Sequence, residues 1–137
     1  MSLFSRSPLR RFALAADALA VTHALFVAFV VWSEILILLG GLLDWDWVRN
    51  LPFRGVHLGL VLYVGVQDLL GRTCPLTLWE NRCRLLAGQT ITGTPFIGRL
   101  VHRFLMCHLS ERTQRRIRLT FVALVLCTLL LVQPHWQ

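Results

Sequence analysis

Three apolar runs separated by polar segments dominate the pattern of the chain. They lie within residues 13–43, 55–71 and 117–132. A helix of ~20 apolar residues crosses the roughly 30 Å hydrocarbon layer of a bilayer, and the three runs reach or approach that length. The pattern therefore predicts an all-α membrane protein with about three transmembrane helices, folded as a single integral-membrane domain over residues 1–137.

The polar segment 72–116 joins the second run to the third. Thr77 and Glu80 have the spacing of a capping box, in which each side chain accepts a hydrogen bond from the backbone N–H of the other. The spacing predicts a short helix over 78–87. Gly88 is placed to end it in a left-handed conformation.

A second helix is predicted over residues 94–109 of the same segment. Thr94 suits the cap position and Pro95 the first helical position. Apolar residues then recur at helical spacing, which predicts an amphipathic helix at the membrane interface. The alternative, a fourth span, would bury Arg99 and Arg103 in hydrocarbon at about 2.5–3.5 kcal/mol each.

The positions of the arginines predict the topology. Three precede the first run, two lie between the first and second, and nine follow the second, the last of them Arg118 at the start of the third. Because cytoplasmic loops are enriched in positive charge, the sequence predicts a bacterial inner-membrane protein with a cytoplasmic N-terminus and a periplasmic C-terminus. Trp45, Trp47 and Trp136 then fall at the outer interface, which indole rings prefer.

The composition agrees with a membrane location and argues against other classes. Hydrophobic residues make up 55% of the chain, and the mean hydropathy is +0.61. A net charge of +7 is compatible with nucleic-acid binding, but the arginines lie at the ends of apolar runs and no zinc module or helix-turn-helix pattern accompanies them. The four cysteines form no CxxC pair, and no catalytic motif is visible, so neither a metal site nor an enzyme is predicted.

Small residues in the first two runs predict close helix packing, either within the chain or against another protein. The residues at this spacing are Ala16, Ala20, Ala24, Ala28, Gly55 and Gly59. Exposed arginines of the cytoplasmic segment are expected to contact anionic lipid headgroups or an acidic subunit. They are Arg99, Arg103, Arg112, Arg115 and Arg116, while Arg118 is expected to extend toward the headgroups.

Polar residues inside the runs are the candidate functional residues, because polar side chains in a membrane usually face a partner or a cavity. They are His23, Glu34, His57, Gln67 and Asp68. In antiparallel helices Glu34 comes level with His57, and His23 with Gln67 or Asp68. These two layers either fix helix packing through hydrogen bonds and ion pairs, or serve as a metal site, a proton relay or a polar cofactor contact.

No cofactor is predicted for the chain by itself. His23 and His57 should differ in height by about 13 Å, too much for two axial ligands of one haem. A haem or other pigment shared with a partner subunit stays open.

Part of the sequence resembles a family of small bacterial membrane proteins classed as a domain of unknown function. The specific part of the likeness is Cys74-Pro75-Leu76-Thr77 followed by Glu80, Arg84 and Ala87-Gly88, with His23 and His57 in the preceding runs. The resemblance implies a membrane class and no activity.

These observations favour a small, non-catalytic accessory or structural subunit that docks onto a larger integral-membrane complex and its lipids. The alternative is a redox, metal or cofactor-handling membrane protein that uses the polar residues within the spans.

Overall fold

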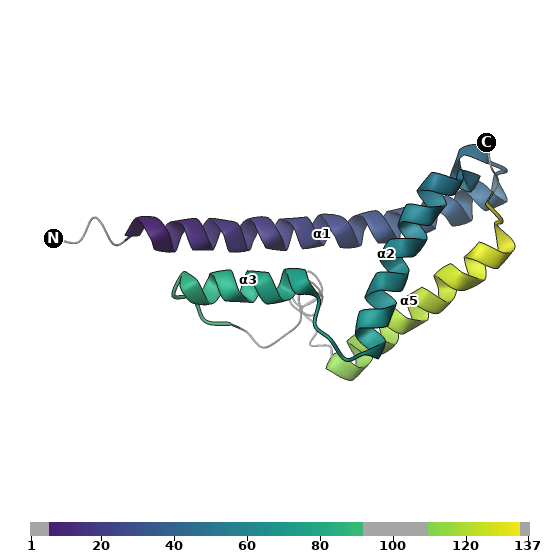
Figure 1. Cartoon of the computed structure of the whole chain (residues 1–137). Helices are drawn as coiled ribbons and strands as arrows, with labels where there is room; N and C mark the ends of the chain where they lie inside the picture. Colours follow the sequence, from purple (N-terminus) through teal and green to yellow (C-terminus); the bar gives the residue numbers. More distant parts are fainter. Residues whose placement is uncertain (1–5, 92–109, 135–137) are drawn as a thin grey trace. The chain divides into compact units, whose positions relative to one another are not determined.

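The computed structural model describes residues 6–91 and 110–134, and within them the chain is all-α, as predicted. Four α-helices and one short 3₁₀-helix follow one another (Figure 1). Their bounds are α1 Arg6–Leu42, η1 Asp46–Arg49, α2 Leu51–Leu69, α3 Pro75–Leu86 and α5 Glu111–Leu131. The helix predicted over 94–109 lies outside the described residues.

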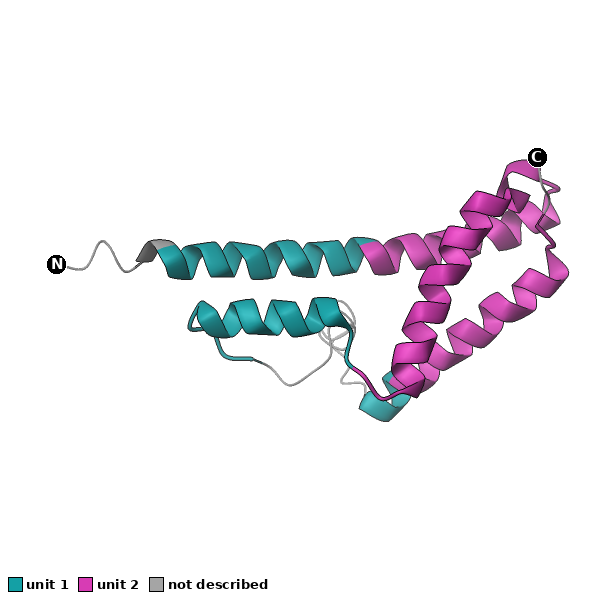
Figure 2. Cartoon of the chain, in the orientation of Figure 1, with its two compact units in different colours: residues 1–25, 73–114 teal, residues 26–72, 115–137 magenta. Residues whose placement is uncertain are grey.

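The chain divides into two compact units, shown in different colours in Figure 2. Unit 1 contains residues 1–25 and 73–114, and therefore the first part of α1 together with α3. Unit 2 contains residues 26–72 and 115–137, and therefore the rest of α1 with η1, α2 and most of α5.

In the described part of the chain, α1 is the helix long and apolar enough to cross a membrane, from Pro8 to Leu42. The second and third predicted spans coincide with α2 and α5, which are also helical. Their apolar stretches carry more charge: α2 contains Arg54 and Asp68, and α5 begins with several arginines.

Three valines form the buried apolar centre of unit 2. Val30 of α1, Val61 of α2 and Val125 of α5 meet there, and five partly buried apolar residues pack against them: Phe26, Leu58, Leu60, Phe121 and Val122. All three helices thus contribute to one small core.

Three glycines of unit 2 let valine side chains pack closely against the helix backbone. A Cβ at Gly65 would lie 3.2 Å from a methyl group of Val122, and a Cβ at Gly40 or Gly41 would come within 2.5 Å of a valine side chain. Gly55 and Gly59, where close packing was predicted, are exposed, and an added Cβ would meet nothing within 4 Å. The contacts between these helices therefore use glycines other than the predicted pair.

α3 begins earlier than the predicted helix and without the predicted capping box. Its cap residue is Cys74, which makes no side-chain capping bond, and Pro75 occupies the first turn. Proline is well suited to the first helical position, so the helix starts there and Thr77 lies inside it. The capping assignment for Thr77 and Glu80 is therefore wrong.

The predicted end of α3 at Gly88 is confirmed. Gly88 has φ +72°, its N–H donates to the carbonyl of Leu85, and the N–H of Gln89 donates to the carbonyl of Arg84. This is a Schellman motif. α2 ends in the same way at Gly71, with φ +65°.

Candidate functional site

The buried residues of the described chain are more often polar than apolar. The buried apolar residues are Ala16, Val30, Ile37, Val48, Val61 and Val125. The buried polar residues are His23, Ser33, Glu34, Arg54, His57, Asp68, Thr77, Glu80, Gln114 and Thr128. Ionisable groups among them gather in both units, and each unit is described separately.

In unit 2, Glu34, Arg54 and His57 form a buried polar group. Glu34 and His57 are each 2% exposed and Arg54 is 5% exposed. α1 supplies the carboxyl group, and α2 supplies the other two, which lie three residues apart on one face of the helix. We call this set the acid–base cluster.

The imidazole of His57 is held between a backbone carbonyl and the carboxyl group of Glu34. Its Nε2 lies 3.0 Å from the carbonyl oxygen of Val30, and its Nδ1 lies 4.0 Å from Glu34 Oε2. Because a carbonyl oxygen only accepts, Nε2 is the donor. The structure thus brings Glu34 and His57 together at one level, in agreement with the antiparallel register.

Arg54 adds a fixed positive charge to the acid–base cluster. Its Nη2 donates to the carbonyl oxygen of Val132 at 2.7 Å, and its charge attracts that of Glu34. Neither carboxyl oxygen of Glu34 has a hydrogen-bond partner in the described structure. Arg54 was not among the predicted site residues, although its position one turn before His57 was the available signal.

A second ion pair in unit 2 joins α2 to α5. Nη2 and Nε of Arg118 donate to Asp68 Oδ1 at 2.6 and 3.1 Å. The guanidinium of Arg118, which could have extended toward lipid headgroups, pairs with this carboxylate at the end of α2. Gln67, beside Asp68, is half-buried.

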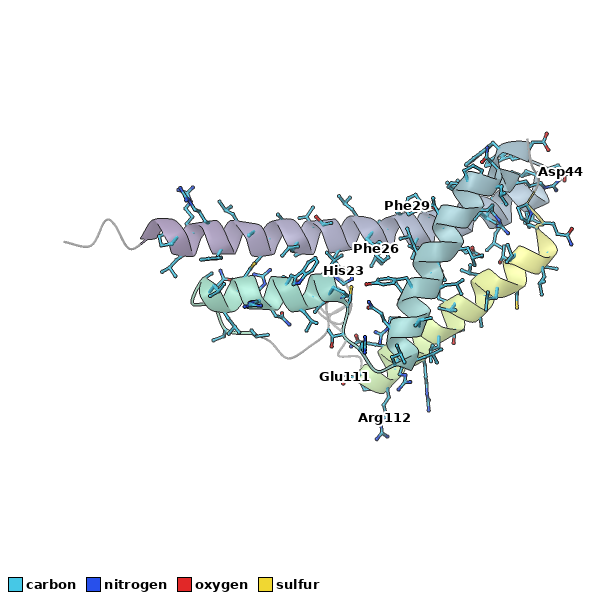
Figure 3. The ribbon with its side chains drawn as sticks, in the orientation of Figure 1. His23, Phe26, Phe29, Asp44, Glu111 and Arg112 are labelled. Carbon is cyan, nitrogen blue, oxygen red and sulfur yellow. The ribbon has the colours of Figure 1, made fainter. Side chains whose placement is uncertain are left out.

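In unit 1, polar side chains connect α1 to α3. His23 Nδ1 lies 3.4 Å from the hydroxyl of Thr77, and both residues are buried. Figure 3 shows His23 on the side of α1 that faces α3. The hydroxyl that was expected to cap α3 is therefore directed to α1.

Arg84 of α3 extends this connection. Its Nε donates to Glu80 Oε1 at 2.8 Å, and its Nη2 lies 3.4 Å from Asp17 Oδ1 on α1. Glu80 is 1% exposed. The motif residues Thr77, Glu80 and Arg84 therefore act together as the polar side of the α1–α3 contact.

The other predicted positions are distributed as follows. Ala16 is buried, Ala20 and Ala24 are half-buried, and Ala28 is exposed. Arg112, Arg115 and Arg116 are exposed on the first turns of α5, and Figure 3 shows Arg112 extending away from that helix. Arg99 and Arg103 lie outside the described residues.

The chemistry available in the described residues is proton exchange and ion pairing. Residues 6–91 and 110–134 contain no group of three or more histidine, cysteine, aspartate or glutamate side chains that could hold a metal ion. Cys74, Cys83 and Cys127 are free thiols. The acid–base cluster is the place where a carboxyl group, an imidazole and a guanidinium meet at a buried position.

Comparisons with known proteins identify a family. No curated protein and no solved structure matches the chain. A family model described as "Protein of Unknown function (DUF2784)" matches residues 13–134, nearly the whole chain. The chain therefore belongs to the DUF2784 family.

Proposed function

We propose that this protein is a small integral-membrane accessory subunit with three spans. The observation that carries the proposal is the distribution of side chains: most buried residues are polar, and large apolar side chains are exposed on every α-helix described. In water such a surface would promote aggregation. In a bilayer it is the stable arrangement, since lipid solvates the apolar side chains and the polar ones pair inside.

The lengths of the helices in unit 2 support three spans. At 1.5 Å per residue, residues 26–42 of α1 extend about 25 Å, α2 with 19 residues about 28 Å, and residues 115–131 of α5 about 25 Å. Each is close to the roughly 30 Å of the hydrocarbon layer. The charges on α2 and α5 do not oppose this proposal, because Asp68 pairs with Arg118 and Arg54 is bonded to a backbone carbonyl.

The two ends of unit 2 differ in a way that supports a bacterial inner-membrane location with the N-terminus in the cytoplasm. Trp45 and Trp47 are exposed at the turn between α1 and α2 and stack on each other, with ring centroids 6.2 Å apart. Arg72, Arg115 and Arg116 are exposed at the other end, where α2 ends and α5 begins. The arginine-rich end is assigned to the cytoplasm by the positive-inside rule.

The small core supports the accessory role. Three valines and five partly buried neighbours form the apolar cluster of unit 2, and Ile37 and Val48 are also buried, whereas many large apolar side chains of its helices are exposed. On α1, the exposed residues Leu25 and Trp32 lie one turn before and one turn after the exposed Ala28. A small residue between bulky ones provides a recess in which a helix of another subunit can fit.

Co-purification from native membranes in a mild detergent tests the accessory role. We expect the tagged chain to bring down partner subunits in fixed stoichiometry, and Ala28→Phe to abolish this by filling the recess. Ala18→Phe, at another exposed alanine of α1, is the matched control and should retain the partners. A chain that purifies alone from native membranes, or that loses its partners equally in both variants, would contradict the proposal.

The acid–base cluster favours a second candidate, a redox, metal or cofactor-handling membrane protein. A buried carboxyl group without hydrogen bonds is costly and is common at functional sites within membranes. Absorption spectroscopy and metal analysis of the purified chain test this candidate. Metal or pigment that stays bound, and that is lost in His57→Ala or His23→Ala, would favour it over the accessory role.

A further inference from the structure

The Glu34–His57 pair places two protonatable groups side by side at a buried position. Both side chains are 2% exposed, and Glu34 Oε2 lies 4.0 Å from His57 Nδ1. Neither oxygen of Glu34 accepts a hydrogen bond in the described structure. A buried carboxylate whose oxygens accept no hydrogen bond is costly. A proton shared with His57 Nδ1 would give Glu34 the hydrogen bond that it lacks.

The hydrogen bond of His57 Nε2 determines which ring nitrogen can exchange a proton with Glu34. Nε2 donates to the carbonyl oxygen of Val30, one helical turn before Glu34. Since Nε2 keeps its hydrogen, Nδ1 is the ring atom that gains or loses a proton, and Nδ1 faces the carboxyl group. The imidazole is thus oriented for exchange with Glu34.

The charges around the pair limit it to one proton. Glu34 comes from α1, Arg54 comes from α2, and the segment after α5 contributes the carbonyl oxygen of Val132, which accepts from Arg54. Arg118 of α5 is engaged by Asp68, and the Asp44–Arg49 pair is largely exposed. When Glu34 is ionised, its charge balances that of Arg54 and the acid–base cluster is neutral. One added proton gives the cluster a net charge of +1, and a second would raise it to +2 in a buried environment.

We propose that Glu34 and His57 form a proton-binding site that holds one shared proton inside unit 2. Water supplies the proton. When it moves from the carboxyl group to the ring, the Oε2–H bond breaks, the Nδ1–H bond forms, and a carboxylate–imidazolium pair results. The inference goes beyond the accessory role, because it holds whether or not a partner subunit binds.

Nuclear magnetic resonance of the purified full chain in detergent tests the proposal directly. Labelling histidine with ¹⁵N and the glutamate carboxyl groups with ¹³C gives few signals, since the chain contains three glutamates, Glu34, Glu80 and Glu111. Over the pH range in which circular dichroism shows the fold intact, we expect the Glu34 and His57 signals to change with one common midpoint, as coupled sites do. Separate midpoints, or no change in either signal, would overturn the proposal.

Two variants extend the test, and the wild-type titration stands even if either variant fails to fold. Glu34→Gln keeps the size of the side chain, and we expect the His57 midpoint to move by at least one pH unit, about tenfold in proton affinity, because the group that shares its proton is gone. His57→Gln keeps a donor for Val30 and reports the converse coupling on the Glu34 signal. Asp44→Asn, at an exposed carboxylate of the same unit, is the control that leaves both midpoints in place. A His57 midpoint unchanged in Glu34→Gln would contradict a shared proton.

Discussion

Arg118 and Asp68 join the start of α5 to the end of α2 through two donors on one carboxylate oxygen, at 2.6 and 3.1 Å. The side chain of Asp68 is 11% exposed and that of Arg118 is 24% exposed. Removing one partner would leave the other charge in a mainly apolar environment. Loss of one member of a buried pair is strongly destabilising, whereas loss of an exposed pair costs little.

We expect Arg118→Leu to lower the free energy of unfolding by about 3 kcal/mol, the lower end for a broken buried pair, since Arg118 keeps some exposure. Thermal unfolding in detergent measures the change. Arg49→Leu is the matched control, because its partner Asp44 is largely exposed and its loss should cost less than about 1 kcal/mol. Equal destabilisation by both substitutions would show that Asp68 and Arg118 do not form a buried pair.

The glycines of α2 provide a second prediction. A side chain at Gly65 would collide with Val122 of α5, whereas a side chain at Gly59 would meet nothing within 4 Å. We expect Gly65→Leu to destabilise unit 2 by about 1–3 kcal/mol through overpacking. Gly59→Leu should be neutral or stabilising, because glycine inside a helix costs about 1 kcal/mol relative to better helix formers.

Thermal unfolding of the two glycine variants in the same detergent provides the comparison. If Gly59→Leu were the less stable variant, the α2–α5 contact would lie on the face of α2 that carries Gly55 and Gly59. This outcome would also contradict the packing of Val122 against Gly65.

Sequence analysis could predict the helices because their signals are local. Long apolar runs marked α1, α2 and α5, and Gly88 marked the end of α3 through its freedom to adopt positive φ. The start of α3 was missed because two local signals competed, and proline at position 75 prevailed over the Thr77–Glu80 capping box.

The candidate site was only partly predictable, because its contacts are long-range. The antiparallel order of the first two helices was enough to place Glu34 level with His57. The spacing of Arg54 and His57 put both residues on one face of α2, but it did not show that this face meets Glu34. No local signal paired Asp68 with a residue of α5, since such contacts depend on side-chain reach and helix rotation. Gly55 and Gly59 meet no neighbour within the described part of the chain for the same reason: a small-residue spacing does not show which face of a helix meets which neighbour.

The contact between α1 and α3 in unit 1 depends on Arg84, which joins Glu80 and Asp17. We expect Arg84→Gln to loosen α3, because buried Glu80 loses a charged partner and α1 loses its link through Asp17. Cys83, half-buried on α3, should then react several-fold faster with a maleimide reagent. The measurement is the labelling rate in a variant whose other cysteines are replaced by serine.

Arg82→Gln is the control for this experiment, since Arg82 is an exposed arginine on the same helix. Its effect on the labelling rate of Cys83 should be small. An unchanged rate in Arg84→Gln would indicate that the apolar contacts of α3 suffice to hold it.

The membrane topology makes a prediction that is independent of stability. Asp46 lies in η1, between α1 and α2, and Gln89 follows α3. If α1, α2 and α5 each cross the bilayer, these two exposed positions lie on opposite sides of it. In a cysteine-free background, Asp46→Cys should react with a membrane-impermeant maleimide added outside intact spheroplasts, whereas Gln89→Cys should react only after the membrane is opened. Reaction of both positions from the same side would reduce the number of spans and contradict the three-span proposal, because an odd number of crossings must separate them.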